Sequence, residues 1–205
     1  MQQLFSRQLR FKDDNGQPFP DWEERKLGEV AYIYDGTHQT PEYVKHGIPF
    51  YSVEHVTSNN FNETKFISEK VFEKELKKIR KGDILMTRIG DIGTARYIDW
   101  NVKASFYVSL ALIRMHEKLN SKFFCHYFNA NDFQRELWNR TIHVAFPKKI
   151  NLGEIGECRI TIPVHTEQTK IANFLSAIDE KINTAQQQIE KTESWKRGLL
   201  QQMFV

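Results

Sequence analysis

The amino-acid sequence predicts an α+β protein, in which a mixed α/β domain is followed by one long helix. Between residues 21 and 165, short β-branched and aromatic runs recur between turn signals, which is typical of strands. Two stretches with helical periodicity interrupt these runs. From residue 166 onward, apolar residues recur at spacings of four and three without any proline, which predicts a helix over 166–205. Residues 1–20 are predicted to be an N-terminal tail.

Length and composition support one globular core with an appendage. The 205 residues exceed a typical single domain but are too few for two large ones. Hydrophobic residues make up 40% of the chain, which is enough for a core and excludes disorder throughout. The net charge of +3 is too small to identify a nucleic-acid-binding protein by itself. Between Lys65 and Lys103, ten basic residues outnumber six acidic ones, which fits either a basic stripe or a solvated helix face.

No targeting or membrane segment is found in the sequence. The first ten residues contain no apolar run long enough for a signal peptide, and no window approaches a membrane span. A soluble, cytoplasmic protein is therefore expected. The two cysteines, Cys125 and Cys158, form neither a CxxC pair nor a zinc framework. We expect two buried thiols, no metal and no cofactor.

The domain is predicted to begin near Trp22, because turn signals at 13–18 precede the first hydrophobic pattern. Short runs of β-branched and aromatic residues then alternate with turn-forming residues, and each run predicts a strand. The predicted strands are 30–34, 48–53, 84–88, 95–99 and 107–115. Helical periodicity predicts two further helices, at 68–79 and 121–138.

The C-terminal stretch carries the clearest pattern in the sequence, a narrow apolar seam with heptad-like spacing. A helix over 167–203 would be about 55 Å long, which exceeds the diameter of a domain of this size. Such a helix either lies on its own domain or pairs with another helix. A helix that lies on its own domain needs a wide apolar stripe, so the narrow seam favours pairing. The pairing residues would be Ile171, Leu175, Ile178, Ile182, Ile189 and Leu199.

The motifs expected of an enzyme that modifies or cuts DNA are weak or missing. The sequence has no Asn-Pro-Pro-aromatic segment to hold a flipped base and no glycine-rich loop for a methyl donor. Asp21, Glu63 and Lys65 formally fit a metal-dependent nuclease, in which two carboxylates hold magnesium, although turn chemistry explains the same residues. The GxxG spacing at 90–93 fits either a phosphate-binding loop or a tight hairpin.

Several segments, taken in order, resemble one known family. They are Leu-Gly-Glu-Val at 27–30, Gly-Thr at 36–37 with Thr-Pro at 40–41, Gly-Ile-Pro-Phe at 47–50, a glycine-aspartate strand with an arginine-glycine turn at 81–90, Ile-Thr-Ile-Pro at 160–163, Glu-Gln-Thr-Lys-Ile-Ala at 167–172, and Gly-Leu-Leu-Gln-Gln-Met-Phe at 198–204. With this pattern the chain resembles the DNA specificity subunit of type I restriction-modification systems over 9–204. One departure is the pair His38 and Gln39, which lengthens the first loop relative to the compact form of the family.

The resemblance implies a non-catalytic subunit that reads double-stranded DNA with a target-recognition domain and a helical spacer. In this family the modification subunits methylate adenine, and the restriction subunits cut DNA with ATP. The chain is therefore expected to bind DNA and both kinds of subunit. Homodimers paired through antiparallel helices would place two domains at opposite ends and read an interrupted palindrome.

A short repeat bears on the architecture. Gln-Gln-Leu-Phe at 2–5 nearly repeats Gln-Gln-Met-Phe at 201–204. A duplicated unit of domain plus helix would leave such a match at its two ends. The family's usual subunit holds two such units, so the chain is either a natural half-subunit or a piece of a longer protein. In a two-unit parent the target would be bipartite but asymmetric.

Nine polar, aromatic or basic residues in loops beside the predicted strands are expected to line the DNA face. Gln39 suits an adenine edge and Arg88 a guanine edge, whereas Lys148 and Lys149 suit phosphates. Arg88 would equally fit a brace for the turn at Gly90. The nine residues are Thr37, His38, Gln39, Tyr43, Arg88, Ser105, Tyr107, Lys148 and Lys149.

Overall fold

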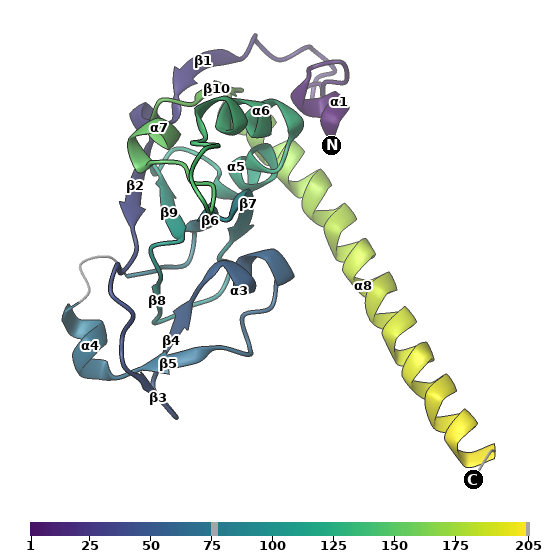
Figure 1. Ribbon diagram of the computed structural model, residues 1–205. Helices are drawn as coiled ribbons and strands as arrows, with labels where there is room; N and C mark the ends of the chain where they lie inside the picture. Colours follow the sequence, from purple (N-terminus) through teal and green to yellow (C-terminus); the bar gives the residue numbers. More distant parts are fainter. Residues whose placement is uncertain (75–77, 204–205) are drawn as a thin grey trace.

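The computed structural model describes residues 1–74 and 78–203 and consists of a two-lobed domain with one long projecting helix (Figure 1). The larger lobe contains a four-stranded antiparallel sheet in the order β2-β9-β6-β7. Its strands are β2 (Ala31–Asp35), β9 (Leu110–Met115), β6 (Ile84–Ile89) and β7 (Asp91–Tyr97). Helices α5 (Ser121–Phe128) and α6 (Asn131–Arg140) pack in the same lobe against β7.

The central strands are buried on both faces, because side chains of a strand alternate between the two sides of a sheet. Ile84 and Met86 of β6 lie in the larger core with the helices. Their neighbour Leu85, with Leu112 of β9, lies in a second core that faces the smaller lobe. One strand therefore contributes to two cores, which explains why β6 reads as a continuous hydrophobic run.

The smaller lobe contains a second four-stranded sheet in the order β3-β5-β4-β8, at the lower end of the domain in Figure 1. Strands β4 and β8 are parallel, and the other pairs are antiparallel. The elements of this lobe are β3 (Tyr43–Val44), β4 (Ile48–Tyr51), α3 (Val53–Ser58), β5 (Lys65–Ile67), α4 (Glu69–Lys74) and β8 (Ser105–Phe106).

A two-stranded sheet closes the domain by pairing its first strand with its last. Strand β1 (Glu23–Lys26) is antiparallel to β10 (Arg159–Ile162). The short helices α2 (Leu27–Val30) and α7 (Leu152–Gly156) pack beside this sheet. Gly28 permits their close approach, because a Cβ atom there would lie 3.3 Å from the Gly156 carbonyl oxygen.

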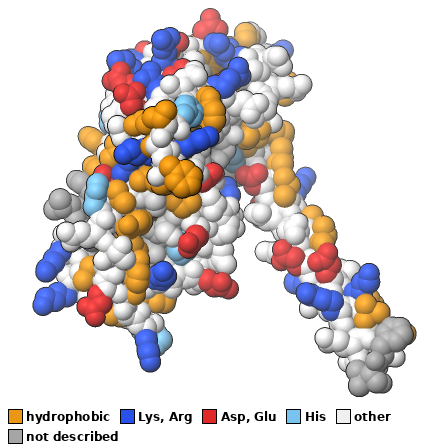
Figure 2. Space-filling view, viewed as in Figure 1, with side chains coloured by type: hydrophobic (Ala, Val, Ile, Leu, Met, Phe, Trp, Pro, Cys, Tyr) orange, Lys and Arg blue, Asp and Glu red, His pale blue; other side chains and the backbone are white. Residues whose placement is uncertain are grey.

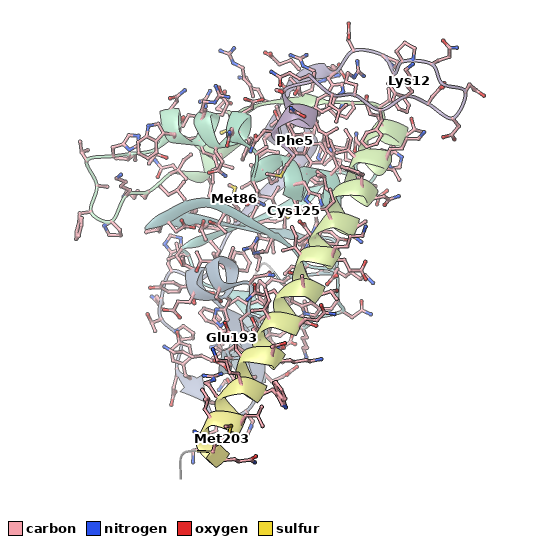
Figure 3. The ribbon with its side chains drawn as sticks, turned by 90° about the vertical axis from the view of Figure 1, so that its right-hand side faces the viewer. Phe5, Lys12, Met86, Cys125, Glu193 and Met203 are labelled. Atoms are coloured by element: carbon pink, nitrogen blue, oxygen red, sulfur yellow. The ribbon has the colours of Figure 1, made fainter. Side chains whose placement is uncertain are left out.

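The N-terminal residues are part of the core, which differs from the tail predicted over 1–20 and from a domain that begins near Trp22. Helix α1 (Gln2–Phe5) buries Leu4 and Phe5. The Phe5 ring meets the rings of Phe123 and Tyr127 edge-on at 5.7 and 5.4 Å. Figure 3 shows Phe5 at the top of the domain beside α5. Two apolar residues among polar neighbours are too few to produce a periodic pattern, so the sequence did not reveal this helix.

A buried carboxylate anchors the long helix α8 (His165–Met203) to the domain. Glu167 has no exposed surface. Its carboxylate accepts hydrogen bonds from the Arg10 guanidinium at 3.1 and 2.8 Å and from the Trp22 indole at 3.1 Å. The next residue, Gln168, accepts a hydrogen bond from the Asn120 backbone N–H and donates one to the Pro163 carbonyl. The first turn of α8 is therefore bonded to four segments of the domain.

Only the first part of α8 packs on the domain. Ile171 and Leu175 are buried in the core, whereas Ile178, Ile182, Ile189 and Leu199 are exposed. The helix has 39 residues and is about 58 Å long, and Figure 1 shows it leaving the domain at an angle. The predicted seam is thus divided between the domain core and an exposed surface.

The five predicted strands are present as β2, β4, β6, β7 and β9, and the periodic long helix is present as α8. The helix predicted over 121–138 is two helices, because the backbone at Ala130 is extended, with a ψ angle of 153°, and interrupts the helical path. The strand predicted over 107–115 begins only at Leu110. Helix α4 covers part of the prediction at 68–79, of which residues 75–77 lie outside the described residues, and α3 replaces the end of the strand predicted at 48–53.

Among the helices that the structure describes, none is both long enough and apolar enough to cross a membrane.

The Glu167 anchor generates a prediction about stability. Glu167→Ala should lower the free energy of unfolding by about 3 kcal/mol, because it leaves the Arg10 charge and the Trp22 N–H without their buried partner. Urea unfolding followed by circular dichroism measures the change. Glu193→Ala, at an exposed position of the same helix, is the control and should change the free energy by less than about 0.5 kcal/mol. Equal effects of the two substitutions would contradict the anchoring role.

Candidate nucleic-acid interface

The loop that follows β2 is organised by Asp35, which sequence reasoning did not single out. One carboxylate oxygen accepts hydrogen bonds from the Gly36 N–H at 3.0 Å and from the Arg88 guanidinium at 2.7 Å. The other lies 2.8 Å from Nε2 of His38. Asp35 therefore fixes the start of the loop that carries Thr37, His38 and Gln39.

The same loop is held against the strand that precedes β9. The Thr37 N–H donates to the Phe106 carbonyl at 3.0 Å, and the Val108 N–H donates to the Thr37 carbonyl at 3.0 Å. Gly36 makes this approach possible, because a Cβ atom there would lie 2.5 Å from the Tyr107 carbonyl oxygen. His38 and Gln39 therefore lie on an exposed turn, and the residues that precede this turn are held in place by hydrogen bonds.

Arg88 is an internal brace and is only 6% exposed. Its guanidinium pairs with Asp35 and donates weakly to the Ile150 carbonyl at 3.4 Å. Its backbone carbonyl accepts from the Ile150 N–H at 3.0 Å. The residue therefore joins the loop after β2 to the loop between α6 and α7. These contacts are with Asp35 and Ile150, whereas the brace expected from the sequence was for the turn at Gly90.

The loop between α6 and α7, residues 141–151, carries Lys148 and Lys149. The Gly90 N–H donates to the Lys148 carbonyl at 2.8 Å, and Lys149 forms isolated bridges with Ile89 and Ile142. Both lysine side chains are exposed. In Figure 2, orange hydrophobic side chains lie beside blue Lys and Arg side chains on the facing surface of the domain.

Tyr43 and Tyr107 lie in the smaller lobe, along a groove of about 620 Å³ that Ser52, His55 and Lys65 also line. The Phe50 ring stands between them, at 6.1 Å from Tyr43 and 6.3 Å from Tyr107. The Lys65 amino group lies 4.8 Å from the centre of the Tyr43 ring. The groove therefore offers flat aromatic surfaces that suit stacking, but its charge does not favour phosphate, because Glu54 and Glu63 line it together with Lys65.

The structure brings together most of the nine predicted contact residues, but it does not place all of them on the surface. His38, Gln39, Tyr43, Lys148 and Lys149 are exposed, while Thr37 and Tyr107 are half-buried. Arg88 and Ser105 are buried, so neither reaches the surface. The supporting residues Asp35 and Ile150 were missed, because only the spatial pairing of distant loops reveals them.

The GxxG segment at 90–93 is a hairpin turn rather than an open cradle. Gly90 and Gly93 have φ angles of +83° and +96°, which side chains with a Cβ atom rarely adopt. Gly93 is covered by α6, since the Gln134 side chain donates to its carbonyl at 2.8 Å. A phosphate therefore has no approach to this glycine.

The nuclease alternative is not supported, because its three residues are far apart. Asp21 lies just before β1, at the top of the domain in Figure 1, whereas Glu63 and Lys65 lie at β5, at its lower end. Within the described part of the chain, no group of three His, Cys, Asp or Glu residues is arranged to hold a metal ion.

Neither cysteine forms a disulfide; Cys158 is buried, and Cys125 is half-buried. Burial raises the pKa of Cys125 and that of Cys158 to about 12, so both stay protonated at neutral pH. Cys125 lines a polar groove of about 960 Å³ between the domain and α8. In that groove, the His126 ring lies 3.3 Å from the Ser176 hydroxyl and 3.7 Å from the Asp179 carboxylate.

Sequence comparison relates the chain to a described family. The family model for the type I restriction modification DNA specificity domain matches residues 20–194. A protein from Methanocaldococcus jannaschii, named as the MjaX specificity subunit of a type I restriction enzyme, is 25% identical over 202 residues. This match covers 94% of the chain and 48% of that protein, so the chain spans about half the length of its curated relative.

Solved structures share the fold. A chain from a study of assembly and conformational transition in the type I R-M system has a TM-score of 0.66 at 20% identity, covering 90% of this chain and 45% of that one. The HsdS subunit from Thermoanaerobacter tengcongensis has a TM-score of 0.61 at 20% identity, covering 80% and 39%. The S subunit from M. genitalium has a TM-score of 0.60 at 17% identity, covering 83% and 42%.

The contact between α5 and α8 generates a prediction about pH. Burial lowers the pKa of His126, and Asp179 offsets this only in part. A histidine with a lowered pKa contributes stability that is present above its unfolded pKa and lost as the pH falls, because the unfolded chain binds the proton more tightly. Between about pH 8 and pH 5, the free energy of unfolding should therefore fall less steeply in His126→Gln than in the wild type. Urea unfolding across this range measures both slopes, and equal slopes would refute the prediction.

Proposed function

Because this chain belongs to the family of type I restriction modification DNA specificity domains, we propose that it reads one half of a bipartite DNA target. The match of the family model over residues 20–194 carries this proposal. The chain corresponds to about half of the MjaX specificity subunit and of the HsdS subunit with which it was compared. One recognition unit of a two-unit reader fits that size.

The proposed unit binds double-stranded DNA in the cytoplasm and has no catalysis of its own. Modification subunits would supply the methyl donor and the active site, and restriction subunits would supply cutting that depends on ATP. The groove of about 960 Å³ between the domain and α8 offers polar groups for docking a protein subunit. We place the modification subunit on α8 and the adjacent surface of the domain.

The proposed DNA surface is the edge where the loops after β2 and after α6 meet. Gln39 is exposed and can bond adenine through its amide, while Lys148 and Lys149 suit phosphates. His38, Thr37, Tyr43 and Tyr107 extend the surface toward the smaller lobe. Arg88 and Ser105 would act from beneath it. The Asp35–Arg88 ion pair keeps the two loops at a fixed separation, which sequence reading requires.

Helix pairing through the exposed part of α8 is the second proposed interaction. Ile178, Ile182, Ile189 and Leu199 are exposed along one side of the helix, and exposed apolar side chains that recur with heptad spacing are typical of helix pairing. The partner would be α8 of a second copy, or the corresponding helix in the other half of a longer protein. Antiparallel pairing would set two recognition domains at opposite ends, so that helix length fixes the spacing of the half-sites.

Selection from a random pool of DNA duplexes, in the presence of the modification subunit, tests the proposed function. The wild type should enrich a defined half-site. Gln39→Ala should relax one base position by about 1–3 kcal/mol. The double variant Lys148→Ala/Lys149→Ala should instead weaken all sequences equally and reduce the salt dependence by about two counter-ions.

The matched control for Gln39 is Gln188→Ala, which removes an exposed glutamine from α8 and should leave the selected sequence unchanged. An unselective pool would refute sequence recognition. Cleavage of plasmid by the isolated chain with magnesium, or methyl transfer by it from S-adenosylmethionine, would refute a non-catalytic role.

Light scattering of the isolated chain tests helix pairing. The wild type should be a dimer at micromolar concentration, and Ile178→Asp/Ile182→Asp should make it monomeric, because each buried charge in a dry seam costs several kcal/mol. Asn183→Asp/Gln187→Asp places the same charges at the same spacing on the polar face and should leave the dimer intact. A wild type that is already monomeric would exclude the homodimer.

A further inference from the structure

The loop between α6 and α7 presents two apolar side chains that no described residue covers. Phe146 is 105% exposed and Val144 is 95% exposed, the two highest values among the exposed large hydrophobic residues. The isolated domain gains no hydrophobic stabilisation from either side chain, because both stay in water. In Figure 3, the segment after α6 extends to the left of the domain, away from α8. The exposure of Val144 and Phe146 therefore indicates that this loop contacts a binding partner.

The base of this loop is fixed by hydrogen bonds, so the tip is held outward rather than frayed. The Ile142 N–H donates to the Lys149 carbonyl at 2.8 Å, which closes the loop. The Gly90 N–H donates to the Lys148 carbonyl, and the Ile150 N–H donates to the Arg88 carbonyl. These bonds attach both ends of the tip to the end of β6.

Trp138, near the end of α6, contacts two residues that flank Phe146 in this loop, Lys148 and His143. The Lys148 amino group lies 4.9 Å from the centre of the Trp138 ring. The His143 ring lies 4.2 Å from the same ring, and its Nε2 atom is 2.9 Å from the Trp138 carbonyl oxygen. Trp138 therefore supports the flanks of the tip, while Phe146 itself stays exposed.

The charge around the tip identifies the chemistry of its partner. Residues 141–153 contain Lys148, Lys149 and His143 but no Asp or Glu. Through the pairing of Arg88 with Asp35, the base of this loop is also joined to the loop that carries Gln39. An apolar tip in a basic setting fits a surface that offers apolar faces between rows of negative charge. Stacked base pairs flanked by phosphates have this arrangement.

We infer that Phe146 is a wedge that enters between two base pairs of the bound duplex. Lys148 and Lys149 then contact the phosphates beside the opened step. Insertion of a phenylalanine unstacks one step and bends the duplex, which brings more of the DNA onto the protein. The inference rests on the proposed DNA-binding function and adds one residue and one structural consequence to it.

Duplexes of the selected sequence, each with 2-aminopurine at one position, test the wedge. The fluorescence of 2-aminopurine rises when the base loses its stacking neighbours. The wild type should raise it at one step of the site. Phe146→Ala should abolish this rise and weaken binding about tenfold, since aromatic stacking on a base is worth about 1–3 kcal/mol. Phe146→Leu should keep part of both effects, because leucine is also an effective wedge.

Leu9→Ala, which removes an exposed apolar side chain from the N-terminal segment, is the matched control and should change neither readout. Thermal unfolding of Phe146→Ala should match that of the wild type, because an exposed side chain adds little to the core.

If the wild type binds its site and Phe146→Ala leaves the fluorescence rise intact, the wedge is excluded while the DNA-binding function stands. Loss of binding to the modification subunit alone would identify the tip as a protein contact. Absence of any DNA binding by the wild type would exclude both.

Discussion

The burial of the Glu167 carboxylate is the constraint on which the architecture depends. Its two oxygens hold Arg10 and Trp22, so one side chain ties the N-terminal segment, the start of the domain and the first turn of α8 together. A buried charge is unfavourable unless it is paired and fully hydrogen-bonded, and here three donors satisfy it. The direction in which α8 leaves the domain is therefore set by chemistry at its first turn, and a helix that projects so far needs such an anchor.

A second ion pair repeats this principle at the proposed DNA surface. Arg88 is buried, its Nε atom has no hydrogen-bond partner among the described residues, and its pairing with Asp35 joins two loops distant in sequence. A buried pair of this kind adds little to stability, because desolvation offsets the attraction. The ion pair instead fixes the position of two loops relative to each other. One loop carries His38 and Gln39, and the other carries Lys148. Sequence reading needs that rigidity more than it needs stability.

The sequence was informative where a pattern repeats and uninformative where one long-range contact decides. The heptad-like spacing predicted α8, and short hydrophobic runs between turn signals predicted β6 and β9. Helices α1, α3 and α7 have four to six residues, fewer than two turns, so they leave no periodic signal. At the candidate site, the exposed loop positions of Gln39 and the lysine pair could be predicted from residue type and turn signals, while their contact with DNA stays a proposal. The burial of Arg88 could not, because its partner Asp35 lies 53 residues away in the chain.

The division of the apolar seam on α8 follows from the same anchor. Ile171 lies about one turn and Leu175 a little over two turns after Glu167, and both face the domain, since the anchored first turn sets the rotation of the helix. A heptad spacing then turns the later residues of the seam gradually out of register with the domain surface, and the helix is already leaving it. Ile178, Ile182 and Ile189 are consequently left on an exposed stripe, which we propose is covered by another helix. One sequence pattern thus encodes two functions in succession, attachment to the domain and, as proposed, attachment to a partner. The rigid first contact allows the second to transmit a defined distance between recognition surfaces.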